Sequence, residues 1–259
     1  MQSNTEPARW NGICRIGGAA ALGGVLVGLV EISITFLPGG NTVQNSVVDW
    51  FHLFQANWFM GLRDLGLLNI LFNTLGILTF FGLYAAHRDD RNQPYAALAL
   101  LVAFLGIAVF FATNRAFAML DLSRQYAAVE SAAQRAMLEA AGQSMLSVGR
   151  SHSPGTFLGF FFLEAAGVLF SLVMLRGQLF SRVTAWVGIL GFGCLLVFEI
   201  LSSFIAGLNG ATMLLAIAAG LLTMTWNVLI ARRLFQIGRD GSALAPADPH
   251  PLPHPMDLA

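Results

Sequence analysis

Lysine is absent from this 259-residue chain, and neither sign of charge is in excess, because 14 basic residues, all arginine, balance 14 acidic ones. Surfaces that bind nucleic acid need a concentration of positive charge, which a neutral chain does not supply. Charged residues of both signs make up only 11% of the sequence. We therefore exclude nucleic acid as a partner.

Cysteine is scarce, and motifs of metal and cofactor enzymes are missing. Cys14 and Cys194 stand alone, without the paired spacing of a metal or redox site. His52, His87 and His152 fall at or beyond the ends of the apolar stretches, so no histidine is placed to ligate haem between helices. HExxH, GxSxG and P-loop motifs do not occur. The sequence predicts no cofactor and no metal site, and it favours a protein that is not an enzyme.

Long apolar stretches are what the chain does contain: 56% of its residues are hydrophobic and its mean hydropathy is +0.68. Because a helix rises about 1.5 Å per residue, about 20 apolar residues cross a hydrocarbon core about 30 Å thick. Lipid offers no hydrogen bonds to the backbone, so such stretches must be helical. Six stretches qualify, at residues 16–36, 58–84, 95–114, 156–175, 183–207 and 211–231. We predict an all-α integral membrane protein, a bundle of six transmembrane helices in a lipid bilayer.

The arginines predict the orientation of this bundle, because short cytoplasmic loops carry the excess of positive charge. With both termini inside, nine arginines are cytoplasmic: Arg9, Arg15, Arg88, Arg91, Arg176, Arg182, Arg232, Arg233 and Arg239. Four lie on the opposite side: Arg115, Arg124, Arg135 and Arg150. The expected topology is N-in and C-in.

Two connections on the predicted outer side are longer than turns. Residues 41–56 carry apolar side chains at helical spacing, which predicts a short helix in the membrane interface. Residues 116–154 contain an Ala-rich run from 126 to 146, which predicts one amphipathic outer helix. Its expected apolar side consists of Tyr126, Val129, Ala133, Ala136, Met137, Ala140 and Met145. We favour a helix that packs on its own protein; the alternative is contact of the loop 116–154 with a partner protein.

The end of the chain differs in composition from the rest. Residues 238–259 are rich in proline, which removes backbone donors and breaks helices. We expect a disordered cytoplasmic tail from residue 238 onward, following a transmembrane domain of residues 1–237.

A few polar and charged side chains interrupt the apolar spans. An ionised side chain costs roughly 2.5–3.5 kcal/mol at mid-span on insertion scales, so each must face protein or water. Counting along the helices places the charged ones in the outer half of the bundle, with Arg115 just beyond the third span. Helical phase adds two asparagines on one side of the second span. The predicted polar pocket consists of Glu31, Arg63, Asp64, Asn69, Asn73, Arg115, Glu164 and Glu199.

This pocket contains more acidic than basic groups. Four carboxylates face two arginines, Arg63 and Arg115, so two carboxylates are protonated or are compensated by a bound cation. The structural alternative is that the two arginines clamp the glutamates and only stabilise helix packing.

Several motifs in the second half of the chain occur together: QYAA at 125–128, VMLR at 173–176, FSR at 180–182, GILG at 188–191 and LIARRLFQ at 229–236. In these motifs the chain resembles a bacterial six-span membrane protein family of unknown function. The resemblance extends over roughly residues 10–238. It implies six helices and a location in the bacterial cytoplasmic (inner) membrane, and it implies no activity.

Three functions remain open. The chain is interpreted first as a non-enzymatic membrane protein that binds a small ligand or a partner, with an acidic polar pocket in the outer half of the bundle. The runner-up is a transporter of a small solute, a proton or another cation, although the two halves of the chain show no repeat. The third is a membrane enzyme that uses carboxylates as acid and base.

Overall fold

The computed structural model describes residues 6–36, 44–149, 151–205 and 209–243, and every secondary-structure element within these ranges is a helix. The longest helices are α1 (Glu6–Phe36), α4 (Leu67–Ala86), α5 (Gln93–Thr113), α8 (Phe157–Arg176), α9 (Arg182–Phe204) and α10 (Asn209–Ala243). The described part of the chain holds six helical segments long and apolar enough to cross a membrane, which confirms the number of spans.

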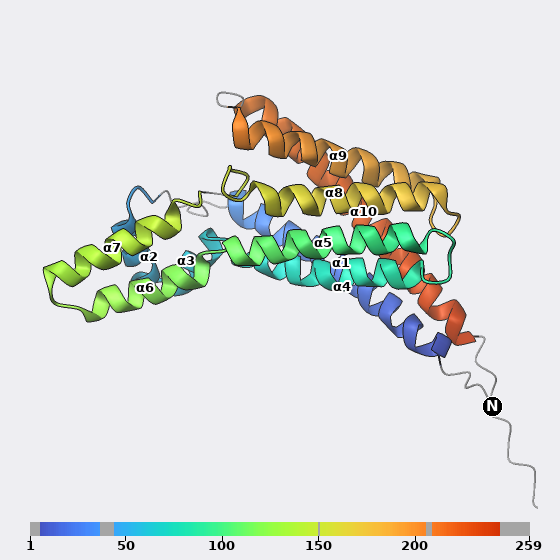
Figure 1. The fold of residues 1–259 in the computed structure, drawn as a ribbon, viewed down its shortest axis with the longest axis horizontal. Helices are drawn as coiled ribbons and strands as arrows, with labels where there is room; N and C mark the ends of the chain where they lie inside the picture. Colours follow the sequence, from blue (N-terminus) through green and yellow to red (C-terminus); the bar gives the residue numbers. More distant parts are fainter. Residues whose placement is uncertain (1–5, 37–43, 150, 206–208, 244–259) are drawn as a thin grey trace, which may run out of the picture.

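These six helices, which we call the bundle, form a ring in the order of the sequence (Figure 1). Each packs against its neighbours along the chain, and α10 returns to pack against α1. Because the helices alternate in direction, α1 begins and α10 ends at the same end of the bundle, which we call the termini end.

Glycines allow the closest approaches between helices of the ring. A Cβ atom on Gly17 of α1 would lie 2.7 Å from the Cα of Gly82 on α4. A Cβ on Gly106 of α5 would lie 2.8 Å from the backbone nitrogen of Leu163 on α8. Small residues at helix interfaces let backbones approach closely, which is how helices in lipid gain packing energy.

The main apolar core fills the half of the ring nearest the termini end. It draws on the first halves of α1, α5 and α9 and on the last halves of α4, α8 and α10. Leu83, Phe170, Trp226 and Leu234 are completely or almost completely buried in it. The opposite half of the ring contains the polar side chains and the cavities described below.

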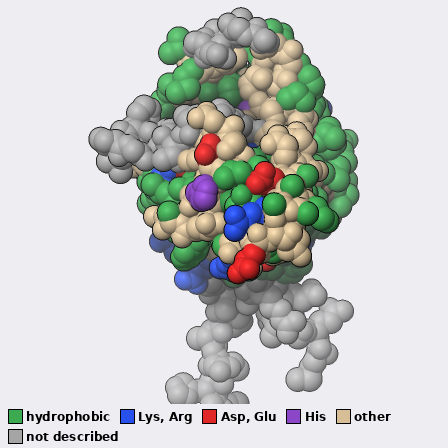
Figure 2. Space-filling view, turned by 90° about the vertical axis from the view of Figure 1, so that its left-hand side faces the viewer, with side chains coloured by type: hydrophobic (Ala, Val, Ile, Leu, Met, Phe, Trp, Pro, Cys, Tyr) green, Lys and Arg blue, Asp and Glu red, His purple; other side chains and the backbone are tan. Residues whose placement is uncertain are grey.

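The remaining helices form a lobe beyond the other end of the bundle (Figure 1). The lobe consists of α2 (Val47–Ala56), α3 (Trp58–Asp64), α6 (Ala116–Ala128) and α7 (Ala132–Leu146). It has its own apolar core, in which Phe51, Leu62 and Met119 are buried. The Ser123 hydroxyl of α6 donates a 2.9 Å hydrogen bond to the carbonyl oxygen of Phe51 on α2. Figure 2, which looks onto the lobe, shows charged side chains of both signs gathered on this face.

The predicted second span is interrupted. The expected helix over 58–84 is divided at Leu65 and Gly66 into α3 and α4, and Gly66 has a φ of +100°. A residue in the left-handed conformation ends a helix, and glycine adopts this conformation at no steric cost. Arg63 and Asp64 therefore belong to the lobe and not to a transmembrane helix.

The helix expected over 41–56 begins at Val47, and residues 41–43 lie outside the described part of the chain. A capping box between Ser46 and Asp49 starts it. We expected its apolar face to lie in the membrane interface. The structure instead buries Phe51 and Phe54 against the other helices of the lobe, because they meet apolar faces of the same chain there.

The single outer helix expected over 126–146 is wrong in its boundaries, and its expected apolar side packs only in part, since Tyr126 and Met145 lie against the apolar core of the lobe. The chain forms α6 and α7, with Val129 extended between them. Met137 on the expected apolar side is 73% exposed, and Ala133, Ala136 and Ala140 are exposed as well. α7 packs instead through Gly142, which lies against Val47 and Phe51 of α2. In an Ala-rich helix both sides are weakly apolar, so composition does not decide which side packs.

The last helix is longer than expected. α10 continues to Ala243, whereas the tail was expected to begin at residue 238, and Gly238 is buried. The first proline of the tail is Pro246, so nothing before it blocks a helix. Residues 244–259 lie outside the described part of the chain.

Candidate functional site

Two cavities adjoin each other where the lobe meets the bundle. The larger, about 650 Å³, lies between the lobe and the bundle, and we call it the vestibule. The smaller, about 240 Å³, lies inside the ring of spans, and we call it the chamber. Asn69 of α4 and Phe160 of α8 line both cavities. The chamber therefore adjoins the vestibule at these two side chains.

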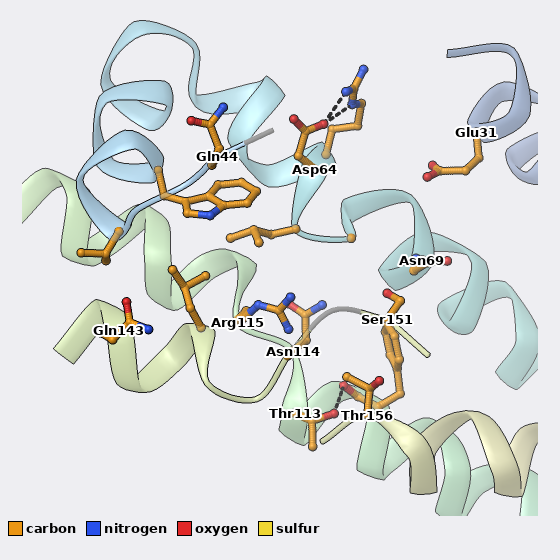
Figure 3. Close-up of a pocket in the computed structure, with 18 of the residues that line it drawn as sticks. Glu31, Gln44, Asp64, Asn69, Thr113, Asn114, Arg115, Gln143, Ser151 and Thr156 are labelled. Carbon is orange, nitrogen blue, oxygen red and sulfur yellow. Dashed lines mark hydrogen bonds and ion pairs between the residues drawn. The ribbon is translucent and has the colours of Figure 1, made fainter. Parts of the chain in front are cut away.

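The vestibule brings together five of the predicted pocket residues from different elements (Figure 3). Glu31 comes from the end of α1, Arg63 and Asp64 from α3, Asn69 from α4, and Arg115 from the junction of α5 and α6. The Arg63 side chain is hydrogen-bonded to Asp64, with Nε donating to Oδ1 over 2.8 Å, and the pair also forms an ion pair. The two charged residues at the end of α3 thus neutralise each other locally.

Arg115 lines the vestibule without an ion pair to any described residue. Its Nε atom is buried and has no hydrogen-bond partner there. Within the described residues, neither Glu164 nor Glu199 is paired with Arg63 or Arg115. The structure therefore does not support a clamp of these two glutamates by the arginines.

The chamber is lined by five helices of the ring and by His152 from the connection before α8. Its buried polar side chains include Asn73 and Thr79 of α4 and Glu164 of α8. Glu164 is only 5% exposed, and its Oε2 atom has no hydrogen-bond partner among the described residues. The Oδ1 atom of Asn73, 4% exposed, has none either. Two buried oxygen acceptors thus line one cavity without a hydrogen-bond partner in the part of the chain that the structure describes.

Glu199 has partners that the sequence did not predict. Its Oε2 atom lies 2.6 Å from Nδ1 of His152, and its Oε1 accepts a 3.2 Å hydrogen bond from the Ser203 hydroxyl. The Ser202 hydroxyl donates a 2.7 Å bond to the carbonyl oxygen of His152. Glu199 itself lines neither cavity, but its partner His152 is part of the chamber wall.

His152 is held in an uncommon conformation. It has a φ of 60°, which is rare for a residue with a side chain. Its ring packs on Phe160 and Phe198, with centroids 4.3 and 4.9 Å away. From the sequence we expect this histidine at or beyond the end of a span, where it is not placed to ligate haem between helices. The signal that could have identified it is Glu199: a carboxylate inside a span needs a partner, and His152 stands just before the fourth span.

The structure thus distributes seven of the eight predicted residues over two linked cavities, and Glu199 lines neither. Asn69, Asn73 and Glu164 line the chamber, and Glu199 is joined to it through His152. Sequence reasoning missed Thr223 and Asn227 of α10, which also line the chamber. Their spacing of four residues within an apolar span was the available signal, since it places both on one helix face. Within the described residues, no group of three or more His, Cys, Asp or Glu side chains is arranged to hold a metal ion.

Comparison with known proteins finds no match: no family model, no curated protein and no solved structure is detectably similar to the chain. The fold and the site define a class, a helical multi-pass membrane protein whose spans surround a mostly apolar chamber with a few buried polar side chains. The resemblance to a six-span family of unknown function stays a prediction from sequence.

Proposed function

We propose that this multi-pass membrane protein binds a small cationic solute in the chamber, and that the solute enters through the vestibule. The observation that carries the proposal is Glu164, a carboxyl group inside a ring of apolar spans with no hydrogen-bond partner for Oε2 among the described residues. A buried carboxylate must be neutralised by a proton or by a positive group. A cation bound in the adjoining cavity supplies that group.

The packing supports entry from the lobe end. The chamber adjoins the vestibule at Asn69 and Phe160, whereas the apolar core fills the half of the ring toward the termini end. Phe80, which lines the chamber, stacks on Phe170 of this core with ring centroids 5.6 Å apart. The chamber thus adjoins the vestibule at one end, through one polar and one aromatic side chain, whereas the packed apolar core closes the other end.

We further infer that the lobe lies outside the cytoplasm, in a bacterial inner membrane. The connections at residues 87–92 and 177–181 lie at the termini end, as does the arginine-rich end of α10. The positive-inside rule places this end in the cytoplasm. The vestibule then opens toward the outside.

The test is ligand-dependent stabilisation of the purified protein in detergent, since a ligand that binds only the folded state raises the unfolding temperature. Chlorides of ammonium, methylammonium, sodium and potassium are compared at constant ionic strength. At least one cation is expected to raise the midpoint saturably in the wild type and not in Glu164→Gln. Glu130→Gln, the same change at an exposed residue between α6 and α7, should respond as the wild type does. No response to any cation, or an equal response in Glu164→Gln, contradicts the proposal.

Transport is the second candidate, because the chamber lies inside the ring formed by all six spans. Transport requires the apolar core at the termini end to open, and the stacked rings of Phe80 and Phe170 are the contact that would have to separate. The measurement is uptake of radiolabelled methylammonium into proteoliposomes. Equal rates in the wild type, Glu164→Gln and Glu199→Gln would count against a charge-coupled transporter. An acid–base enzyme has less support, since Glu199 is occupied by His152 and Ser203.

A further inference from the structure

The chamber presents mainly hydrogen-bond acceptors to whatever occupies it, although Trp226, which also lines it, has a buried Nε1 donor without a partner among the described residues. Its two threonines have already used their only hydroxyl hydrogen: Thr79 donates to the carbonyl oxygen of Leu75 and Thr223 to that of Gly220, both over 3.0 Å. A hydroxyl whose hydrogen is bound in this way can only accept. Both side chains therefore add acceptors, and no donors, to the chamber wall.

The two asparagines both direct the nitrogen of the side-chain amide toward their own helix. Nδ2 of Asn73 donates to the carbonyl oxygen of Asn69 over 2.8 Å, and Nδ2 of Asn227 donates to that of Thr223 over 2.9 Å. Only the amide nitrogen can donate to a carbonyl oxygen, so these bonds identify which end of each amide faces its own helix. The oxygen ends remain, and Oδ1 of Asn73 is buried without a partner in the described structure.

Glu164 of α8 adds a further oxygen to this set in the chamber wall. With Asn73 it provides two side chains that are more than nine-tenths buried, that line the same cavity and that each have an oxygen without a partner among the described residues. Buried acceptors are normally satisfied, and each exception needs an explanation. A ligand with several N–H donors and a positive charge explains both.

Much of the remaining chamber wall is aromatic. It includes Phe72, Phe80, Phe160, Phe192 and Trp226. Aromatic faces attract organic cations, whereas a metal ion that keeps its hydration shell gains little from such a wall. At about 240 Å³ the chamber is smaller than the roughly 300–1,000 Å³ typical of drug-sized sites, so it fits a small molecule.

We propose that the occupant of the chamber is a small primary amine, whose ammonium group pairs with Glu164 and donates to the neighbouring oxygens while its apolar body lies against the aromatic wall. This inference rests on the proposed function and narrows it from a cation to an organic ammonium with N–H donors. A quaternary ammonium has the charge without the donors. An alcohol of the same shape has one donor without the charge.

The experiment compares four probes by isothermal titration calorimetry on the full-length protein in detergent: benzylamine, benzyl alcohol, benzyltrimethylammonium and potassium chloride. Benzylamine is expected to bind at least about tenfold more tightly than each of the others, since a matched polar group is worth roughly one to two orders of magnitude. Potassium should not compete with it. Equal or tighter binding of benzyl alcohol or benzyltrimethylammonium contradicts the proposal that the occupant is a primary amine.

Binding of potassium without binding of benzylamine overturns the assignment of an amine but leaves the proposed cation site intact, whereas no binding of any cation overturns both. Among variants, Glu164→Gln and Asn73→Leu should each weaken benzylamine at least about fivefold, with Glu130→Gln unchanged. Unchanged affinity in both chamber variants contradicts the assignment. If a chamber variant fails to fold, the comparison of probes on the wild type still decides the question.

Discussion

Nδ1 of His152 lies 2.6 Å from Oε2 of Glu199, and this contact links the connection between α7 and α8 to helix α9 of the ring. Glu199 is completely buried, whereas His152 is partly exposed and forms part of the chamber wall. The contact therefore satisfies a carboxyl group within a span and also holds one side chain of the chamber wall in place.

Replacing this histidine should destabilise the protein. His152→Ala leaves the buried Glu199 with only the Ser203 hydroxyl, and an unsatisfied buried polar group costs about 1–3 kcal/mol. The measurement is the free energy of unfolding in detergent. His52→Ala, at an exposed histidine of α2, should have little effect. Because the two residues are in contact, the double change His152→Ala with Glu199→Gln should cost less than the sum of the two single changes, and strict additivity would contradict this coupling.

The break between α3 and α4 should depend on glycine. Gly66 has a φ of +100°, and a left-handed conformation costs residues with a Cβ about 1–2 kcal/mol. Gly66→Ala is expected to lower the free energy of unfolding by about that amount. The matched control is Gly193→Ala in α9, where a Cβ meets nothing within 4 Å and helix propensity should make the change neutral or stabilising. Equal effects of the two changes would contradict a strained junction.

His87 should make stability depend on pH. It is fully buried between α4 and α5 and stacks on Phe180 with ring centroids 5.5 Å apart. Burial lowers the pKa of His87 below its usual 6.5, against smaller opposing effects of its hydrogen bond to Leu83 and of Asp90. The unfolded chain therefore binds the proton more readily, so the stabilisation is present above pH 6.5 and is lost as the pH falls through the lower folded-state pKa.

Thermal unfolding between about pH 7.5 and pH 5.5 checks this, because the charge of histidine changes in that range. The midpoint should fall with pH in the wild type and fall less in His87→Phe, which keeps a ring against Phe180 and cannot titrate. His52→Gln, at an exposed histidine, should retain the wild-type slope. A slope in His87→Phe as steep as that of the wild type would show that other groups cause the dependence.

The topology leads to a labelling prediction. Ser147→Cys, after α7 of the lobe, and Gln178→Cys, between α8 and α9, are introduced into a chain whose Cys14 and Cys194 are replaced by alanine; both new positions are exposed. A membrane-impermeant maleimide should label Ser147→Cys in intact bacterial cells. Gln178→Cys should react only after the membrane is opened. The reverse pattern would place the lobe in the cytoplasm.

The spans could be predicted because crossing lipid is a local requirement. About 20 apolar residues suffice, whatever the rest of the chain does. The same criterion missed the break at Gly66, because apolar residues flank Arg63 and Asp64 on both sides and so predict one span, and the positive φ of Gly66 is visible only in the structure. It also missed the packed side of α7, which depends on where Val47 and Phe51 of α2 meet it.

The sequence by itself determined that the chain forms six membrane helices and that Glu31, Glu164 and Glu199 lie at similar depths, because depth follows from counting residues along each span. Only the tertiary structure decided which of these carboxyl groups finds a partner. Glu199 receives His152, whereas Oε2 of Glu164 is left without one among the described residues. The physical reason is that pairing depends on the order of helices in the ring and on the rotation of each about its axis, and neither is encoded by hydropathy along the chain.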